Sequence, residues 1–320
     1  MVGVGRSDSD GGPAGSTAAA DYAQTNNTAG IIAMLAAMAS FACGDSLMKL
    51  SSTDLPTGEL VWLRATFMSA AGLTYAVLSG AFRKAWTLLA KPMLLRAIGD
   101  AGGALAYQSA LARMAFADLV AINQINPLTV TAASAIFLGE RVGWRRWTAA
   151  LVGLCGVLLI IRPGTSAFTW WSIVAIVAVL FATLRDVSTK SIDRTVPAVL
   201  VMWFSSSAVA LGSLTMLFFE SWIWPQPLVL LQVAGASAFS LTGHLCIITA
   251  VRKGELSAVA PFRYSIMIWA LLLGLVIWGQ WPDPLAMLGM AIVTGAGIYT
   301  FRREMVARRR ARPSFDPSST

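Results

Sequence analysis

Long apolar stretches alternate along the chain with short segments rich in glycine, proline and charged residues. A helix of about 20 residues crosses the hydrocarbon core of a bilayer, which is about 30 Å thick. The pattern therefore predicts an all-α integral membrane protein with ten transmembrane helices. We expect these helices at about residues 29–50, 58–79, 92–112, 117–138, 144–161, 168–190, 197–218, 228–250, 257–279 and 284–301.

The second half of the chain repeats the pattern of the first half. Pro127 and Pro261 are the prolines that lie well inside an expected helix, and each precedes an aliphatic run that ends in a glycine. The first helix of each half closes with the same spacing of acid and base: Asp45-x-x-x-Lys49 and Asp186-x-x-x-Lys190. Each half contains five expected helices, so the second must enter the membrane from the opposite side. The chain is therefore predicted to form two inverted five-helix repeats, an architecture of secondary transporters.

The two repeats are expected at residues 29–162 and 163–302. Residues 1–28 contain almost no large apolar side chains, which predicts a disordered tail. This tail lacks the short hydrophobic core of a signal peptide. Residues 303–320 begin with a basic run that suits an anionic membrane surface.

The charge of the chain follows its predicted topology. Only 12% of the residues are charged and 56% are hydrophobic, while the net charge is +8. If the N-terminus is cytoplasmic, 17 of the 24 lysines and arginines fall in cytoplasmic segments and three fall on the outer side. By the positive-inside rule both termini are then cytoplasmic. We expect a multi-pass protein of the plasma membrane (the bacterial inner membrane) that contacts lipid and no nucleic acid.

Three motifs carry a resemblance to a known family. They lie at residues 60–64 (Leu-Val-Trp-Leu-Arg), 126–141 and 260–282. With them the chain resembles the drug/metabolite transporter superfamily, in its ten-helix EamA-type branch with two EamA repeats. The resemblance implies a central cavity lined mainly by helices 1, 3, 4, 6, 8 and 9. The segment Ala-Pro-Phe-Arg-Tyr looks most like that of bacterial riboflavin and S-adenosylmethionine uptake carriers, whereas Gln280 departs from the usual Glu.

Ionisable and amide side chains inside the expected helices fall into two layers. The outer layer contains Asp45, Lys49, Glu59, Arg64, Asn123, Gln124 and Asn126. The inner layer contains Arg96, Asp100, Arg185, Asp186, Lys190, His244 and Arg263. Charges at membrane depth pair with one another or face a wet cavity. The i, i+4 spacing places Asp45 near Lys49, Arg96 near Asp100 and Asp186 near Lys190. Arg64 is expected to meet Glu59 or Asp45 as a tie between helices 1 and 2.

Arg263 has no acid three or four residues away in either direction. Its partner is therefore expected from another helix, with Asp100 and Asp186 at similar depth, or from a bound solute. Tyr264 offers a ring and a hydroxyl for a cavity wall. Together with Asn126 and Asp45, these residues and the pair Arg96 and Arg185 are the candidate substrate contacts.

Proline interrupts the hydrogen bonds of a helix, so Pro127 and Pro261 are candidate hinges at matching positions of the two repeats. Fixed kinks are the alternative. His244 titrates near neutral pH and is a candidate for a coupling proton, as are Asp100 and Asp186. The same His244 could instead be a packing residue.

The combined pattern predicts a secondary transporter for a small polar or zwitterionic metabolite, such as an amino acid, a vitamin or an S-adenosylmethionine-like compound. It would work by alternating access, with uptake favoured, H⁺ as a candidate coupling ion and a monomer or homodimer as the assembly. Export of amino acids or toxic metabolites is the alternative. An intramembrane lipid-modifying enzyme or a scaffold are alternatives of another class. No cofactor or metal site and no catalytic residue is expected, since no nucleotide-binding loop, metal-type spacing or nucleophile motif is present.

Overall fold

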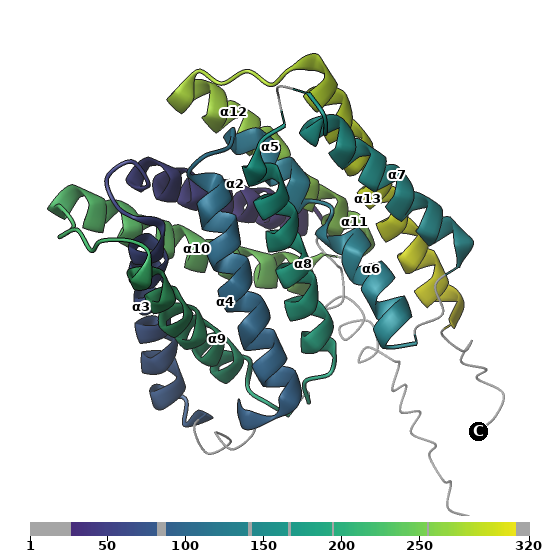
Figure 1. The fold of residues 1–320 in the computed structure, drawn as a ribbon. Coiled ribbons are helices and arrows are strands. Elements are labelled where there is room, and N and C mark those ends of the chain that lie inside the picture. The colour runs from purple at the N-terminus through teal and green to yellow at the C-terminus, as the bar shows by residue number, and fades with distance from the viewer. Residues whose placement is uncertain are drawn as a thin grey trace, which may run out of the picture.

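The computed structural model describes residues 27–81, 88–139, 143–165, 168–193, 195–254 and 256–311. The expected disordered and basic tails fall largely outside these residues. Within them the chain is helical throughout (Figure 1). The elements are α2 (Asn27–Ser51), α3 (Thr57–Leu78), α4 (Lys91–Leu111), α5 (Phe116–Asn123), α6 (Asn126–Phe137), α7 (Trp144–Ile161), α8 (Trp170–Lys190), α9 (Ala198–Ser213), η2 (Leu214–Phe218), α10 (Pro227–Lys253), α11 (Leu256–Val259), η3 (Ala260–Ser265), α12 (Ile266–Trp278) and α13 (Pro284–Ala311).

Each of the ten expected spans corresponds to one helix or to a broken helix. Eight spans are long and apolar enough to cross a membrane, and α7 contributes a shorter apolar stretch, Trp147–Ile161. The remaining span is α4, the third along the chain, which is more polar because it carries Lys91, Arg96 and Asp100. The prediction of an all-α ten-helix membrane protein is confirmed. The last helix continues to Ala311, beyond the expected end at residue 301.

The fourth and ninth spans are interrupted at the two prolines. The fourth divides into α5 and α6, with Pro127 in the first turn of α6. In the ninth, the 3₁₀-helix η3 carries Pro261 and separates α11 from α12. Proline supplies no backbone N–H and crowds the preceding turn, which explains both interruptions.

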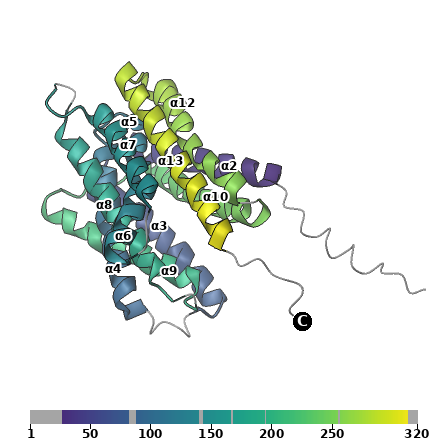
Figure 2. The same ribbon diagram turned by 90° about the vertical axis from the view of Figure 1, so that its right-hand side faces the viewer.

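Most helix contacts in the first repeat have an equivalent in the second, so that exchanging the two repeats turns one contact into the other. The first helix of each half packs on the third helix of the other, so α2 contacts α10 and α8 contacts α4. The second helices, α3 and α9, contact each other, and so do the fifth helices, α7 and α13. The α7–α13 pair forms the side of the bundle that faces the viewer in Figure 2. The two repeats are therefore interleaved rather than side by side.

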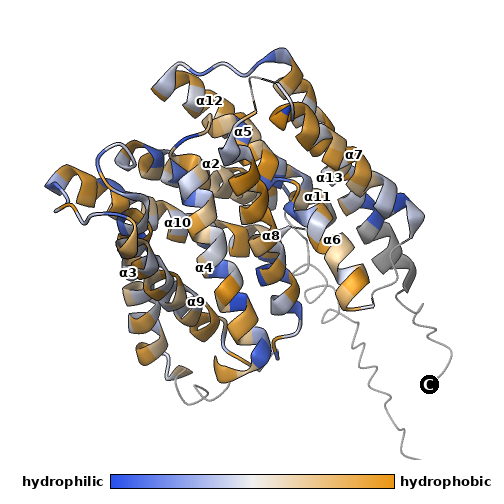
Figure 3. Cartoon of the chain, in the orientation of Figure 1, coloured by the Kyte–Doolittle hydropathy of each residue, from blue (hydrophilic) through white to orange (hydrophobic). Residues whose placement is uncertain are grey.

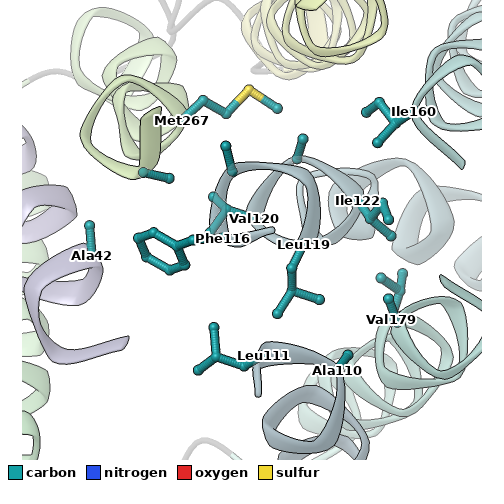
Figure 4. Packing of buried hydrophobic residues seen from close by; sticks show 14 of the residues in the cluster. Ala42, Ala110, Leu111, Phe116, Leu119, Val120, Ile122, Ile160, Val179 and Met267 are labelled. Atoms are coloured by element: carbon teal, nitrogen blue, oxygen red, sulfur yellow. The ribbon is translucent and has the colours of Figure 1, made fainter. Parts of the chain in front are cut away.

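One end of the bundle, which we name the closed face, contains the helix ends at Ser51, Thr57, Phe116, Ile161 and Trp278; it lies at the upper left in Figure 1. A large apolar core lies beneath it. Figure 4 shows this core around α5, whose side chains point toward those of surrounding helices. Its central members, all at most 2% exposed, are Phe116, Leu119, Val120 and Ile122.

The outward surfaces of the helices are apolar, as Figure 3 shows by their orange colour. Exposed large hydrophobic residues include Leu78, Phe137 and Val276. Such surfaces are what lipid covers in a membrane protein. Blue positions in Figure 3 interrupt the orange on α4 and α8. These two neighbouring helices carry the charges described next.

Candidate functional site

Four charged residues of α4 and α8 form a cluster within the membrane-spanning region. Arg96 and Asp100 are paired at 3.5 Å on α4, as their spacing predicted. Arg185 of α8 lies 3.8 Å from Asp100 and donates from Nε to Asp186 at 2.7 Å. We name these four residues the central charge cluster. It contains two positive and two negative groups, so its net charge is zero.

A third helix, α6, also contacts this cluster. Asn126, at the start of α6, donates from Nδ2 to Oδ2 of Asp186 at 2.8 Å. Thr183 of α8 donates to Oδ1 of Asn126 at 3.3 Å. Asn126, which the sequence assigned to the outer layer, thus contacts Asp186, which it assigned to the inner layer.

A second polar cluster joins four helices. Arg64 of α3 lies 3.5 Å from Asp45 of α2, which confirms the predicted tie, and its Nη2 donates to Ser240 of α10 at 2.7 Å. Tyr107 of α4 donates from its hydroxyl to Oδ2 of Asp45 at 2.8 Å. We name these four residues the Asp45 cluster. Sequence reasoning missed Tyr107 and Ser240, although a tyrosine hydroxyl inside an apolar span is itself a signal of a polar partner.

Both clusters remain partly accessible. The side chains of Arg185 and Asp186 are 33% and 32% exposed, and that of Arg64 is 27% exposed. Charged groups at this depth are not compatible with lipid contact. The protein therefore does not fully enclose these three side chains. Asp100 lies between the two arginines of the cluster, with Oδ2 facing Arg96 at 3.5 Å and Oδ1 facing Arg185 at 3.8 Å.

The two lysines of the repeated motif have different partners from those expected. Lys49 donates from Nζ to the carbonyl oxygens of Leu111 at 2.6 Å and Met114 at 2.7 Å, at the end of α4. The unpaired carbonyls at a helix C-terminus attract a cation. Lys190 donates to Oγ of Ser134 at 2.8 Å. The acids of the two motifs instead take the partners described above.

Arg263 and Tyr264 lie on η3 and point to different environments. Arg263 is exposed, and it forms no ion pair with an acid of the described residues, although Asp186 is near enough for the two charges to interact. Tyr264 is only 7% exposed. A Cβ atom placed on Gly297 of α13 would meet the Tyr264 hydroxyl at 1.7 Å, so this ring fills the space above a glycine. The structure thus places Tyr264 in packing with α13 and not on a cavity wall.

His244 is placed one turn from the Asp45 cluster on α10. Its Nδ1 lies 2.7 Å from the carbonyl oxygen of Ser240, so Nδ1 carries a proton and donates it. The ring packs edge-on against Phe41 at 5.1 Å between centroids. Nε2 remains for a further partner.

Gln280 is part of the closed face. Its Oε1 accepts a hydrogen bond from the backbone N of Phe116 at 3.3 Å, which joins the start of α5 to the end of α12. An amide is sufficient for this contact, so the replacement of the usual Glu leaves the joint in place. Among the described residues no group of His, Cys, Asp and Glu could hold a metal ion.

Comparison with known proteins agrees with these features. The EamA-like transporter family matches the chain twice, at residues 28–162 and 169–302. The chain belongs to the EamA-like transporter family. The two EamA segments begin 141 residues apart, and Asp45 and Asp186 are separated by the same number of residues. The two clusters are thus built around equivalent acids of the two EamA repeats.

Related proteins are transporters and not enzymes. The pseudopaline exporter CntI of Pseudomonas aeruginosa is 25% identical over 84% of this chain and 94% of its own length. The S-adenosylmethionine uptake transporter of Rickettsia felis is 23% identical over 89% of this chain and 96% of its own length. The riboflavin transporter of Rhizobium johnstonii is 25% identical over 69% of this chain and 72% of its own length. All three act on small molecules, which is the substrate class of this EamA protein.

One solved structure has the same fold. A protein crystal structure superposes with a TM-score of 0.58 at 22% sequence identity, covering 89% of this chain and 99% of the other. The EamA fold of the chain therefore agrees with a solved structure along nearly the whole length of that protein.

Proposed function

We propose that this EamA protein is a secondary carrier that takes up a small polar or zwitterionic metabolite by alternating access. The observation that carries the proposal is the central charge cluster. It contains charges of both signs from both repeats, lies within the spanning helices, remains about one third exposed at Arg185 and Asp186, and is joined by Asn126 of the first repeat. A zwitterion offers the complementary pair of charges.

The charged residues of the cluster, and Arg263 beside it, have distinct chemical roles in this proposal. Arg185 and Arg96 are suited to a carboxylate or another anionic group, since a guanidinium binds such groups with two parallel hydrogen bonds. Asp100 and Asp186 are suited to a cationic group, because each carries a carboxylate that now faces an arginine of the cluster. Arg263 is exposed close to Asp186 and would bind an anionic part of the solute as it enters.

Alternating access requires parts that move, and the interrupted spans provide them. The breaks at Pro127 and Pro261 lie at matching positions of the two EamA repeats. Rocking of one repeat against the other would change the angle at these breaks. With both termini in the cytoplasm, the closed face is the outer face, and the conformation described here faces inward in the plasma membrane, as a monomer or homodimer.

Proton coupling would use a carboxyl group or the imidazole of the site. Asp100 and Asp186 contact the cluster cations directly, so protonation of either acid would release an arginine for the solute. His244 is the alternative, because its ring lies one turn from the Asp45 cluster, where Nδ1 donates to the carbonyl oxygen of Ser240. The coupling is tested by measuring whether the rate of uptake depends on a proton gradient. Substituting Asp100, Asp186 and His244 one at a time shows which of them this dependence requires.

Export is the second candidate function, because one relative is named as a pseudopaline exporter while others are named for uptake. The two directions differ in a simple measurement. Inside-out and right-side-out vesicles are mixed with the same labelled solute, and the initial rates of its entry are compared. Faster entry into right-side-out vesicles is expected for an uptake carrier, and the opposite result would assign export.

The substrate class is tested by ligand-induced stabilisation of the purified protein. S-adenosylmethionine, riboflavin and amino acids are each added at increasing concentration, and the melting temperature is followed. A ligand that binds the folded state raises it. We expect Asp186→Asn and Arg185→Gln to weaken the response at least about tenfold, which is about 1.4 kcal/mol. Asp54→Asn, on an exposed turn, is the matched control that keeps it. A response unchanged in both cluster variants contradicts the assigned site.

A further inference from the structure

Two glutamates at the closed face each bind the backbone of the opposite repeat. Glu220, in the segment after η2, accepts a hydrogen bond through Oε2 from the backbone N of Gly58 at 2.7 Å. Glu59, in the first turn of α3, accepts one through Oε2 from the backbone N of Ile223 at 3.0 Å. Each carboxyl group thus holds the segment that carries the other one. We name Gly58, Glu59, Glu220 and Ile223 the carboxylate clasp.

The clasp is closely packed. A Cβ atom on Gly58 would meet Cβ of Met216 at 2.3 Å and Oε2 of Glu220 at 3.0 Å. One helical turn beyond Glu59, the ring of Trp62 packs edge-on against Trp222 with 5.3 Å between centroids. The first turn of α3 and the segment after α9 therefore touch without room for water between their backbones.

One oxygen of Glu59 has no partner in this arrangement. Glu59 is only 2% exposed, and its Oε1 is buried without a hydrogen bond. The charge of Glu220 acts on the Glu59 carboxyl group and repels a negative charge there. A buried, unpartnered anionic oxygen beside a second carboxylate is strongly unfavourable. A neutral carboxyl group removes the repulsion and supplies an O–H donor.

Among the described residues, no neighbouring element brings a cation into an ion pair with Glu59. The segments η2 and α9 contain no titratable residue, and α10 has none before His244. Asp54, in the turn before α3, is exposed and negative. Arg113, at the end of α4, is held over the ring of Trp171 at 4.4 Å. None of the ion pairs in the described part of the chain includes Glu59.

Water reaches the clasp from the closed face. A pocket of about 480 Å³ is bounded by Thr57, Glu220 and Ile223, with Arg113 on its other side. Glu220 therefore lines the pocket directly, while Glu59 binds the backbone of a second lining residue.

We propose that the Glu59–Glu220 pair is a proton-binding site that is occupied when the closed face is shut and empties when that face opens. A hydronium ion in the pocket gives its proton to Oε1 of Glu59 and leaves as water. The neutral carboxyl group no longer repels the charge of Glu220, while Oε2 of Glu59 keeps its bond from Ile223. When the clasp separates, water solvates both carboxylates and takes the proton back. This site goes beyond the proposed carrier function and does not depend on the identity of the solute.

The test measures the separation of the two sides of the clasp against pH. Cys43, Cys155 and Cys246 are replaced by Ala, and nitroxide labels are attached through Thr53→Cys and Trp224→Cys, two exposed positions on opposite sides. Pulsed electron paramagnetic resonance of the full chain in lipid nanodiscs then gives the distance distribution from about pH 5 to about pH 8.5, a range that brackets a strongly shifted carboxyl group. We expect the short distance at low pH and a growing longer population as pH rises.

Two substitutions separate the proposal from a general pH effect. Glu59→Gln carries a permanent N–H donor in place of the O–H, so the short distance should persist at every pH. Glu220→Gln keeps an acceptor for Gly58 but removes the repulsion, so the midpoint of the distance change should move to lower pH by about one unit. Asp54→Asn is the control that keeps the parent midpoint.

Several results would overturn the proposal. One is a pH response of Glu59→Gln equal to that of the parent; another is a parent distance that does not change with pH. Loss of the response in Asp118→Asn instead would assign the proton to Asp118, the other acid near this face with an unpartnered oxygen. A change that follows the Na⁺ concentration at constant pH would assign a metal cation in place of the proton.

Discussion

Asp45 and Asp186 occupy the same position in the two EamA repeats, yet their partners differ. Asp45 is held by Arg64 and by the hydroxyl of Tyr107, whereas Asp186 is held by its neighbour Arg185 and by Asn126. The repeats have therefore kept the acids and changed what surrounds them. One acid is anchored by side chains from other helices, and the other is bound to a cation on its own helix that also contacts Asp100.

The Tyr107 hydroxyl makes a hydrogen bond whose contribution can be measured. Tyr107→Phe removes the donor to Asp45 and should lower the free energy of unfolding by about 1.5 to 3 kcal/mol, the range for a hydrogen bond to a charged group. Tyr75→Phe, at a position 64% exposed, is the matched control and should change little. Equal stability of the two variants in detergent unfolding would show that Asp45 does not depend on Tyr107.

An ion pair at the closed face makes stability depend on pH. Arg162 lies 2.5 Å from Asp283 and holds the pKa of that carboxyl group below its usual value. Because this pKa is lower in the folded state, the ion pair stabilises the protein above the unfolded pKa of about 3.9. That stabilisation is lost as the pH falls through the pKa of the folded state. Asp283→Asn should therefore melt slightly below the parent near neutral pH, with the gap closing below about pH 4. A gap that widens on acidification would contradict this.

Sequence reasoning predicted the charged residues of the site better than their partners. The pairs Arg96–Asp100 and Arg64–Asp45 follow from helical spacing and depth, which a sequence contains. The bonds from Tyr107 to Asp45 and from Asn126 to Asp186 depend on how the two repeats interleave, which periodicity does not specify. The carboxylate clasp was missed for the same reason.

At the scale of elements, eight of the ten spans follow from apolar length, and the two breaks follow from proline. The close approach of α7 and α13 follows from glycine. A Cβ atom on Gly289 would meet the backbone oxygen of Gly156 at 2.5 Å, so no side chain fits at this crossing. Small residues serve the same purpose at helix interfaces in other membrane proteins.

Alanine substitutions on α13 test this crossing. Gly289→Ala forces α7 and α13 apart and should destabilise the protein by about 1 to 3 kcal/mol. Gly295→Ala, on the same helix, has no atom within 4 Å of the new Cβ and should be neutral or stabilising by up to about 1 kcal/mol. Thermal unfolding of both variants in the same detergent gives the comparison. Similar melting temperatures would mean that the crossing adjusts without strain.

At the scale of the whole molecule, several side-chain contacts between the EamA repeats lie at the closed face, in addition to the helix pairs and polar clusters that join the repeats deeper in the bundle. Besides the carboxylate clasp, Ser51 donates to Gln232 at 2.9 Å, and Phe116 contacts Trp278 with 5.9 Å between ring centroids. The apolar core around α5 lies directly beneath these contacts. An inward-facing carrier would have this arrangement.

The orientation of the closed face is open to direct measurement. We expect a cysteine at Trp224, which is 88% exposed, to react with a membrane-impermeant maleimide in intact cells. A cysteine at Lys253, exposed at the end of α10, should react only after the membrane is opened. Both measurements use the variant without native cysteines. The reverse pattern would place the closed face in the cytoplasm.

The position of α5 also bears on how the protein is made. This helix of eight residues contacts α4 and α7 of its own repeat, but also α8, α12 and α13 of the second repeat. During synthesis these last three helices leave the ribosome after α5. The side chains of α5 therefore remain without part of their packing partners until the final helix has been synthesised and inserted. A chain truncated after the first repeat would expose Phe116 and Leu119, and quality-control proteases would have a clear signal that it is incomplete.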